Sequence, residues 1–364
     1  MVGYRFRKRT ALLAVTAAVI GAALSGCLPG QNSTSAPEAS VTAYTSEEVF
    51  KALEDSLSEY SDRTVFSARL EQDTIDRAVL EIRHAHPEYF WINGYSTTMS
   101  GSETTVEFMT LNDYMPEQLR EMHGELMSAV NDVISQVPTS LGEYEQALFV
   151  HDYIVNNTSY ATDKVSLSYN GLWGNAYGCL VDGSAVCQGY SEAYSLILQK
   201  LGIECGVCTG QSIRGRHAWN YVKMYGDYYW VDVTWDDPES EDGSTLDKLC
   251  HNYFMINDEL LLRTRSLDEG QYLIPSCTSM DRNYFVMKNA YLTDYNTDEI
   301  GRILAESADT RLAEMMFRDK AGFDKAIDSL FGNEEIWELS DYADLGYDLN
   351  YVYDDKMYIL EISY

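Results

Sequence analysis

The chain has 364 residues, enough for one large domain or two smaller ones, and it is rich enough in apolar and aromatic residues to build a hydrophobic core. Its 57 acidic residues against 26 basic ones give a formal net charge of −31, which repels phosphate backbones and anionic membrane surfaces. The composition therefore excludes a largely disordered chain and argues against a nucleic-acid partner.

Residues 1–26 have the pattern of a secretion signal. Four basic side chains within residues 5–9 precede an apolar stretch over 11–24 that is short for a membrane span. The stretch ends in Leu-Ser-Gly-Cys at 24–27, which resembles the lipobox of bacterial lipoproteins. This resemblance implies that Cys27 is lipidated and anchors the protein on the extracytoplasmic face of a bacterial cell membrane. An ordinary secretory signal with an incidental cysteine is the alternative.

Residues 27–42 are rich in Ser, Thr, Pro and Gly without an apolar period, which is typical of a flexible tether. The region from 43 to 140 alternates helix-like and strand-like patterns. We predict helices over 46–60, about 74–84 and 116–137, and strands over 89–92 and 104–110.

The region from 141 to 280 concentrates the chemistry. A helix is predicted over 142–156, and a second follows Cys187, with an apolar stripe up to Leu201 and a stop at Gly202. Cys187 then lies in the first turn of that helix, with Ser184 as its expected N-cap. The unpaired N–H groups and the positive end of the helix dipole favour a thiolate there, which is the nucleophilic form of cysteine.

A cysteine nucleophile requires a base and a group that orients the base. His217 lies on a predicted strand, and Asp232 lies on the next one, after a turn at Gly226. A two-residue turn would leave these side chains two pairs out of register, too far apart for a hydrogen bond. We therefore predict a longer loop, or a bulge, between Met224 and Tyr228.

Three segments together resemble the transglutaminase-like superfamily. They are Val-Cys-Gln-Gly-Tyr at 186–190, His-Ala-Trp-Asn at 217–220 and Val-Asp-Val-Thr-Trp-Asp at 231–236, in the order and spacing of that superfamily. The resemblance covers about 141–257 and implies an α+β fold with a papain-like core, in which a helix carrying the cysteine packs on an antiparallel sheet. Residues 151–155 resemble the helix that precedes such a core, and 251–254 the strand that closes it.

The resemblance implies roles for three residues: Cys187 as nucleophile, His217 as general base and then acid, and Asp232 as the group that orients His217. It implies acyl transfer through a thioester, without a metal or another cofactor. The backbone N–H of Cys187 is an expected oxyanion donor. The second donor stays unassigned; the side chains considered for it are Asn157, Tyr160 and Trp173.

The expected reaction is hydrolysis of peptide or amide bonds in a peptide, a protein or a cell-wall peptide. A non-catalytic surface binding module on the same fold, in which the thiol of Cys187 does not react, is an alternative from another functional class. A protein cross-linking transglutaminase is a third. The acidic stretch over 236–242 either lines the cleft and favours cationic substrates or forms a solvated loop.

The remaining cysteines and histidines are interpreted as structural. Cys205 and Cys208 form a C-x-x-C pair on a predicted strand, where successive side chains point to opposite faces and chelate poorly. Core thiols or one disulfide remain open for them and for Cys179, Cys250 and Cys277. The histidines interpreted as structural are His84, His86, His123 and His151.

Residues 281–364 are predicted to form a small acidic α/β region. We expect strands over 284–292 and 311–317, helices over 297–307 and 321–331, and a terminal hairpin of 351–353 with 357–362.

Overall fold

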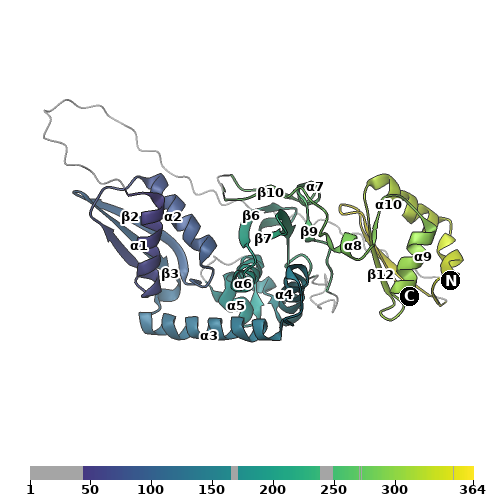
Figure 1. The fold of residues 1–364 in the computed structure, drawn as a ribbon, viewed down its shortest axis with the longest axis horizontal. Helices are drawn as coiled ribbons and strands as arrows, with labels where there is room; N and C mark the ends of the chain where they lie inside the picture. The colour runs from purple at the N-terminus through teal and green to yellow at the C-terminus, as the bar shows by residue number, and fades with distance from the viewer. Residues whose placement is uncertain (1–43, 165–170, 238–248, 270, 272, 347) are drawn as a thin grey trace, which may run out of the picture.

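The computed structural model describes residues 44–164, 171–237, 249–269, 271, 273–346 and 348–364. The predicted signal peptide, Cys27 and the tether lie outside these residues. Three mixed α/β modules stand side by side along the long axis, in the order of the chain (Figure 1). Within the described residues, no helix combines the length and apolar character needed to cross a membrane.

The N-terminal module is an antiparallel three-stranded sheet, in the order β1-β3-β2, covered by two helices. Its elements are α1 (Ser46–Ser58), β1 (Arg63–Phe66), α2 (Gln72–Ala85), β2 (Ile92–Ser100) and β3 (Glu103–Thr110). The strand predicted over 89–92 is wrong apart from its last residue. Phe90 and Trp91 are both buried, so they lack the alternation of a strand and instead pack in the hydrophobic cluster of the next module.

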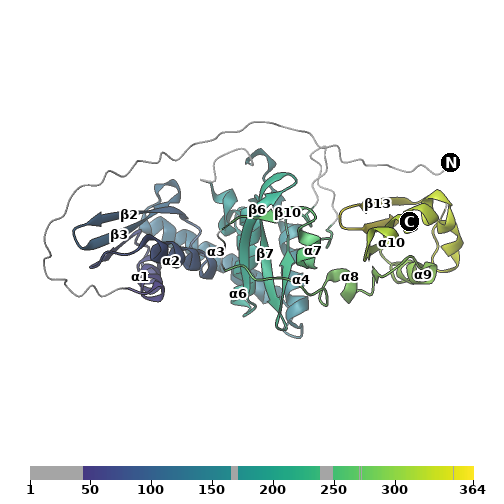
Figure 2. The same cartoon turned by 90° about the horizontal axis from the view of Figure 1, so that it is seen from above.

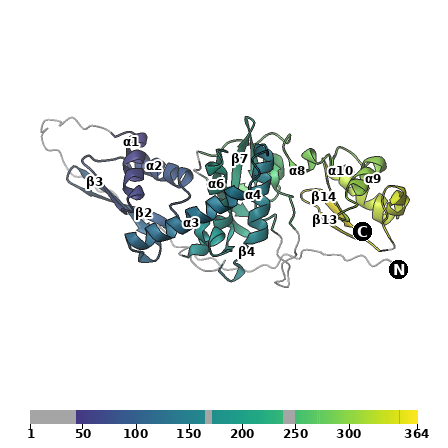
Figure 3. The same ribbon diagram turned by 60° about the horizontal axis from the view of Figure 1, so that its bottom comes forward.

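Helix α3 (Pro116–Gln136) connects this module to the core (Figure 3). Pro116 occupies its first turn, where the missing N–H costs nothing. The buried side chains of α3 pack in one cluster with those of α4 (Glu143–Asn157) and of the core helix α6 (Cys187–Lys200). By packing, α3 therefore belongs with the core, although the sequence boundary at 140 groups it with the N-terminal region.

The core is an antiparallel five-stranded sheet, in the order β10-β6-β7-β8-β9, with α6 against one face (Figure 2). Its strands are β6 (Cys205–Ser212), β7 (Gly215–Met224), β8 (Asp227–Val231), β9 (Phe254–Ile256) and β10 (Arg265–Leu267). Smaller elements complete it: β4 (Ser159–Tyr160), α5 (Ala176–Leu180), β5 (Ser184–Ala185) and α7 (Asp258–Leu261).

The predicted long loop between β7 and β8 is wrong. Met224 pairs with Asp227, so the turn has only two residues, and both have positive φ, as a tight hairpin turn requires. The ladder ends at the pair Asn220–Val231. Asp232 therefore leaves the sheet, and it reaches His217 from a turn beyond the strand rather than from a paired position.

The C-terminal module is a four-stranded sheet, in the order β11-β12-β14-β13, with helices packed on it. Its elements are α8 (Tyr284–Met287), β11 (Tyr291–Leu292), α9 (Thr297–Glu306), β12 (Leu312–Phe317), α10 (Lys320–Ile327), β13 (Asn350–Asp354) and β14 (Ile359–Ser363). The strand predicted over 284–292 begins instead with α8, because the Asn283 side chain accepts a hydrogen bond from the N–H of Phe285 and caps that helix.

Candidate active site

Cys187 is the first residue of α6, and the residue before it is extended. Val186 serves as the N-cap without a side-chain bond, whereas Ser184, the predicted cap, lies in β5. The N–H of Val186 donates to the carbonyl of Trp173 at 2.8 Å. Since the first N–H groups of a helix have no intrahelical acceptor, that of Cys187 is directed out of the helix end.

Gly189 lets the start of α6 pack closely against its support. A Cβ at this position would lie 2.8 Å from the Ala185 Cβ and the Asn175 carbonyl oxygen. Gly189→Ala is therefore expected to lower the free energy of unfolding by about 1–3 kcal/mol. It should also slow alkylation of Cys187, because relieving the clash moves the first turn of α6. Thermal unfolding and the alkylation rate measure the two effects.

Gly124→Ala is the matched control, because Gly124 lies in α3 and a Cβ there meets nothing within 4 Å. This change should leave stability unaltered or raise it by up to about 1 kcal/mol. Equal stability of the two variants would contradict the close packing at Gly189.

His217 lies on β7, opposite Gly210 of β6, and its Nε2 lies 2.7 Å from Oδ2 of Asp232. This bond leaves Nδ1 as the ring nitrogen for Cys187, with which His217 also interacts by hydrogen bonding and charge. Burial lowers the pKa of His217, but the charge of Asp232 and the two hydrogen bonds outweigh it and raise the pKa to about 9. At neutral pH this imidazole is therefore protonated.

Asp232 is held from several sides. It is 1% exposed; Oδ1 accepts the N–H of Trp235 at 3.1 Å, and Oδ2 accepts both His217 and the guanidinium of Arg265. Burial opposes ionisation, but the charges of His217 and Arg265 prevail and lower the pKa of Asp232 to about 2. The carboxylate is thus ionised throughout the physiological range.

Arg265 is the residue that sequence reasoning missed. Its fully buried guanidinium lies over the rings of Trp235 and Tyr253, at 4.1 and 4.2 Å from their centroids, and Nε lies 3.0 Å from Asp232. Two aromatic faces and a carboxylate compensate the cost of burying this cation. No motif marks an arginine on a three-residue edge strand, so the sequence offered no signal for it.

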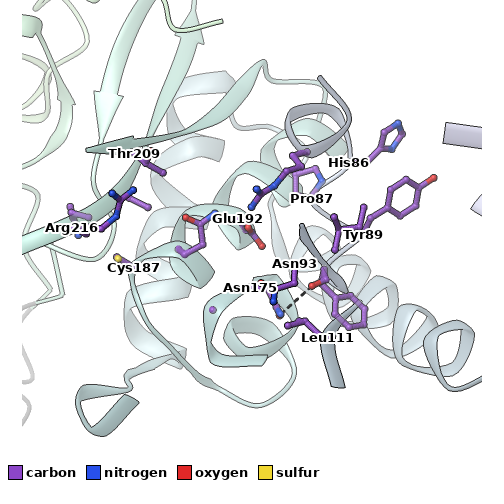
Figure 4. A pocket seen from close by; sticks show the side chains of 17 residues that line it. His86, Pro87, Tyr89, Asn93, Leu111, Asn175, Cys187, Glu192, Thr209 and Arg216 are labelled. Carbon is purple, nitrogen blue, oxygen red and sulfur yellow. Dashed lines mark hydrogen bonds between the residues drawn. The ribbon is translucent and has the colours of Figure 1, made fainter. Parts of the chain in front are cut away.

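A cavity of about 450 Å³ opens beside Cys187 and His217 (Figure 4). One wall comes from the core, and the other from the N-terminal module: the end of α2, the turn before β2, the start of β2 and the residue after β3. That second wall is formed by Arg83, His86, Pro87, Tyr89, Phe90, Ile92, Asn93 and Leu111. No sequence motif assigns this module a role at the site.

The N-terminal module is bonded to the core next to this cavity. The Gln199 side chain donates to the carbonyl of His84 at 2.9 Å, and Lys200 forms an ion pair with Glu88 at 3.1 Å. Asn175 links both walls: its Nδ2 donates to the carbonyl of Phe90 at 3.3 Å, while its Oδ1 caps α5.

The second oxyanion donor stays unassigned. Asn157 donates to the carbonyl of Tyr153, and neither Asn157, Tyr160 nor Trp173 is among the residues that line the cavity beside Cys187. The side-chain amides of Asn93, Asn175 and Gln188 do line it, but in this conformation Gln188 donates to Glu192 and Asn175 donates to Phe90.

The six cysteines among the described residues are all buried, and none of them forms a disulfide. Of the two alternatives for Cys205 and Cys208, core thiols or a disulfide, the structure has core thiols. Burial raises the pKa of Cys179 to about 12 and raises the pKa values of Cys205 and Cys208 further. Such thiols are inert, whereas Cys187 opens onto a cavity.

A second polar cluster lies behind the site and joins α4 to the turn after Asp232. His151 is fully buried; its Nδ1 lies 3.0 Å from Asp152, and its Nε2 lies 3.2 Å from Asp236. His251 bonds Asp152 at 2.9 Å. Burial opposes the charge of His151, but the two carboxylates raise its pKa to about 9, so it carries both protons at neutral pH.

Three of these residues, His151, Asp152 and His251, lie close enough to share a metal ion. Both nitrogens of His151 already face carboxylates, however, so a metal ion would have to displace one of these bonds. As the structure has it, the cluster is an ionic network. It also fixes the acidic stretch: Asp236 is buried in it, and Tyr190 donates to Asp237 at 2.7 Å. Residues 238–242 lie outside the described residues.

Comparison with known proteins points to one family. Residues 130–235 match the family model described as the transglutaminase-like superfamily, a segment that includes Cys187, His217 and Asp232. None of the curated proteins matches the chain.

Solved structures resemble the chain only in part. A crystal structure of a TGase is 15% identical with a TM-score of 0.29, over 47% of this chain and 50% of that one, so the chain spans about half its length. A structure described as a candidate cysteine protease from Cytophaga hutchinsonii is 14% identical, with a TM-score of 0.25. That match covers 39% of this chain and 61% of the other. A candidate protease from Parabacteroides distasonis is 10% identical, with a TM-score of 0.25. The match covers 43% of this chain and 40% of that one. Such scores support no inference about activity.

Proposed function

We propose, from the match of residues 130–235 to the transglutaminase-like superfamily, that the protein is a cysteine enzyme that hydrolyses peptide or amide bonds. The observation that carries the proposal is the 2.7 Å bond between His217 and an ionised, buried Asp232 at the edge of the cavity that Cys187 lines. We further propose that the enzyme is anchored by lipid on Cys27 outside a bacterial membrane and acts on protein or cell-wall peptides there.

In the proposed mechanism, Cys187 attacks as a thiolate beside the protonated His217. The sulfur bonds the substrate carbonyl carbon, and the carbonyl oxygen becomes an oxyanion that the N–H of Cys187 stabilises. His217 then donates its proton to the leaving amine, and a thioester remains. Neutral His217 takes a proton from water, the resulting hydroxide attacks the thioester, and the acid product leaves with the thiolate restored. Asp232 and Arg265 hold the imidazole in position throughout.

We favour water as the acceptor because the cavity of about 450 Å³ suits a short peptide segment, and both of its walls are fixed by bonds between modules. A cross-linking enzyme would have to admit a second protein chain to the thioester. A binding module would not need the protonated imidazole at all.

The proposal predicts that iodoacetamide alkylates Cys187 at pH 6 at least ten times faster than the other cysteines of the described residues, because Cys187 opens onto the cavity beside His217 whereas the others are buried in the protein. Mass spectrometry of the modified peptides measures this, with Cys187→Ala as the control. Comparable alkylation rates for Cys187 and Cys205 would overturn the assignment of Cys187 as the nucleophile. The non-catalytic binding module would then be the remaining hypothesis.

Substrate assays distinguish a hydrolase from a cross-linking transglutaminase. Release of peptide from a labelled protein should exceed incorporation of a fluorescent amine, and it should decline as the pH rises through about 9, where His217 loses its proton. Incorporation without release would instead identify a cross-linking transglutaminase.

A further inference from the structure

Two opposite charges face the same cavity without bonding to each other. Glu192 on α6 and Arg83 on α2 both line it, one from the core and one from the N-terminal module. Figure 4 shows Glu192 between Cys187 and Pro87, the latter in the opposite wall. Within the described part of the chain, neither side chain forms an ion pair, and Glu192 accepts only from the Gln188 amide, at 2.7 Å, and from the backbone of Ala176.

The carboxylate of Glu192 is poorly compensated. Burial raises the pKa of Glu192, while the Gln188 hydrogen bond and the charge of Arg83 only partly oppose this effect. A half-buried carboxylate held by neutral donors gains from a cation that comes to bond it.

The other charged side chains of the cavity already have partners. His86 bonds Glu54 at 2.9 Å, and Arg216 bonds Asp268 at 3.1 Å. Glu192 and Arg83 are therefore the two charges that a ligand can satisfy, one negative and one positive.

We propose that this cavity binds a zwitterionic end group of the substrate, with its ammonium on Glu192 and its carboxylate on Arg83. An internal residue of a peptide has neither group, whereas a free α-amino acid at the end of a side-chain arm has both. Glu192 follows Cys187 by five positions, a rise of about 7.5 Å along α6. An arm of a few methylene groups can span that rise from the amide under attack. This inference rests on the proposed hydrolase and names its substrate class.

The test measures binding and requires no turnover. The probe is Nε-(N-acetylalanyl)lysine, in which the α-ammonium and α-carboxylate are free at the end of a butyl arm. Isothermal titration into the full protein carrying Cys187→Ser should give a Kd at least about tenfold lower than for the Nα-acetylated probe or the α-carboxamide probe, since each lacks one charge-assisted bond.

Charge variants in the same background assign each contact. Glu192→Gln should abolish the discrimination against the acetylated probe but keep that against the carboxamide, and Arg83→Gln should do the reverse. Arg83→Lys should retain binding, and Glu121→Gln, an exposed site on α3, should change nothing. Circular dichroism checks that each variant is folded.

Equal affinities for the three probes, no binding at millimolar concentration, or an unchanged pattern in the charge variants would overturn the subsite. The last result would mean that Glu192 and Arg83 neutralise each other across the cavity. Since titration does not depend on the thiol, these failures are distinct from failure of the proposed hydrolase, which the alkylation rates of Cys187 decide.

Discussion

Asp232→Asn is expected to reduce the rate of peptide release by about 10³- to 10⁴-fold and the free energy of unfolding by about 3–5 kcal/mol. Both effects follow from one buried carboxylate that serves two cations. Without its charge, the pKa of His217 falls and the imidazole loses its orienting acceptor, while the guanidinium of Arg265 remains buried without a counter-ion. Steady-state kinetics and urea unfolding measure the two losses.

Adding Arg265→Met to Asp232→Asn separates the two roles. The double variant should recover much of the lost stability, because a buried ion pair can be replaced by apolar packing at little cost. It should recover little activity, because His217 still lacks its carboxylate. Recovery of activity together with stability would show that Asp232 acts by holding the fold and not by orienting His217.

His151→Leu is expected to lower the free energy of unfolding by about 3–5 kcal/mol at pH 6, because it leaves Asp236 buried without its cation. Asp236→Asn in the same chain should recover part of this loss. The position lies behind the cavity and not in it, so the relative alkylation rates of the cysteines should keep their order. Urea unfolding followed by Trp fluorescence measures the stability.

The pH dependence of this loss has a definite sign. The pKa of His151 is raised from its ordinary 6.5 to about 9, so its contribution to stability is complete below 6.5 and disappears as the pH rises through 9. The difference between the wild type and His151→Leu should therefore shrink from pH 6 to pH 10. His217 titrates in the same window but is present in both proteins, so it cancels. A constant difference would show that His151 acts by packing alone.

The sequence predicted those parts of the site that depend on local pattern. The apolar stripe after Cys187 predicted its helix, and the strand patterns predicted β7 and β8 with His217 and Asp232 near each other. It erred where geometry departs from ideal pairing. The two-residue turn after Met224 should have separated the pair, but β8 stops at Val231 and Asp232 turns back.

The rest of the site depends on contacts between segments far apart in the chain, which no local period encodes. Arg265 reaches Asp232 from 33 residues away. Asp236 pairs with His151 across 85 residues, although an acidic stretch reads as solvated surface. The sequence predicts a strand where Tyr89 and Phe90 form a wall of the cavity, because consecutive aromatic residues suit a strand as well as a buried turn between modules.

Asn175 gives the structure a mechanical property. One side of its amide bonds the carbonyl of Phe90 in the outer wall of the cavity, and the other caps α5, while its own backbone carbonyl lies close to Gly189 in the helix of the nucleophile. A motion that widens the gap between the modules would strain this amide together with the Gln199–His84 and Lys200–Glu88 bonds, and through Asn175 it would disturb the support of the nucleophile. The width of the gap and the position of the nucleophile are thus coupled through Asn175.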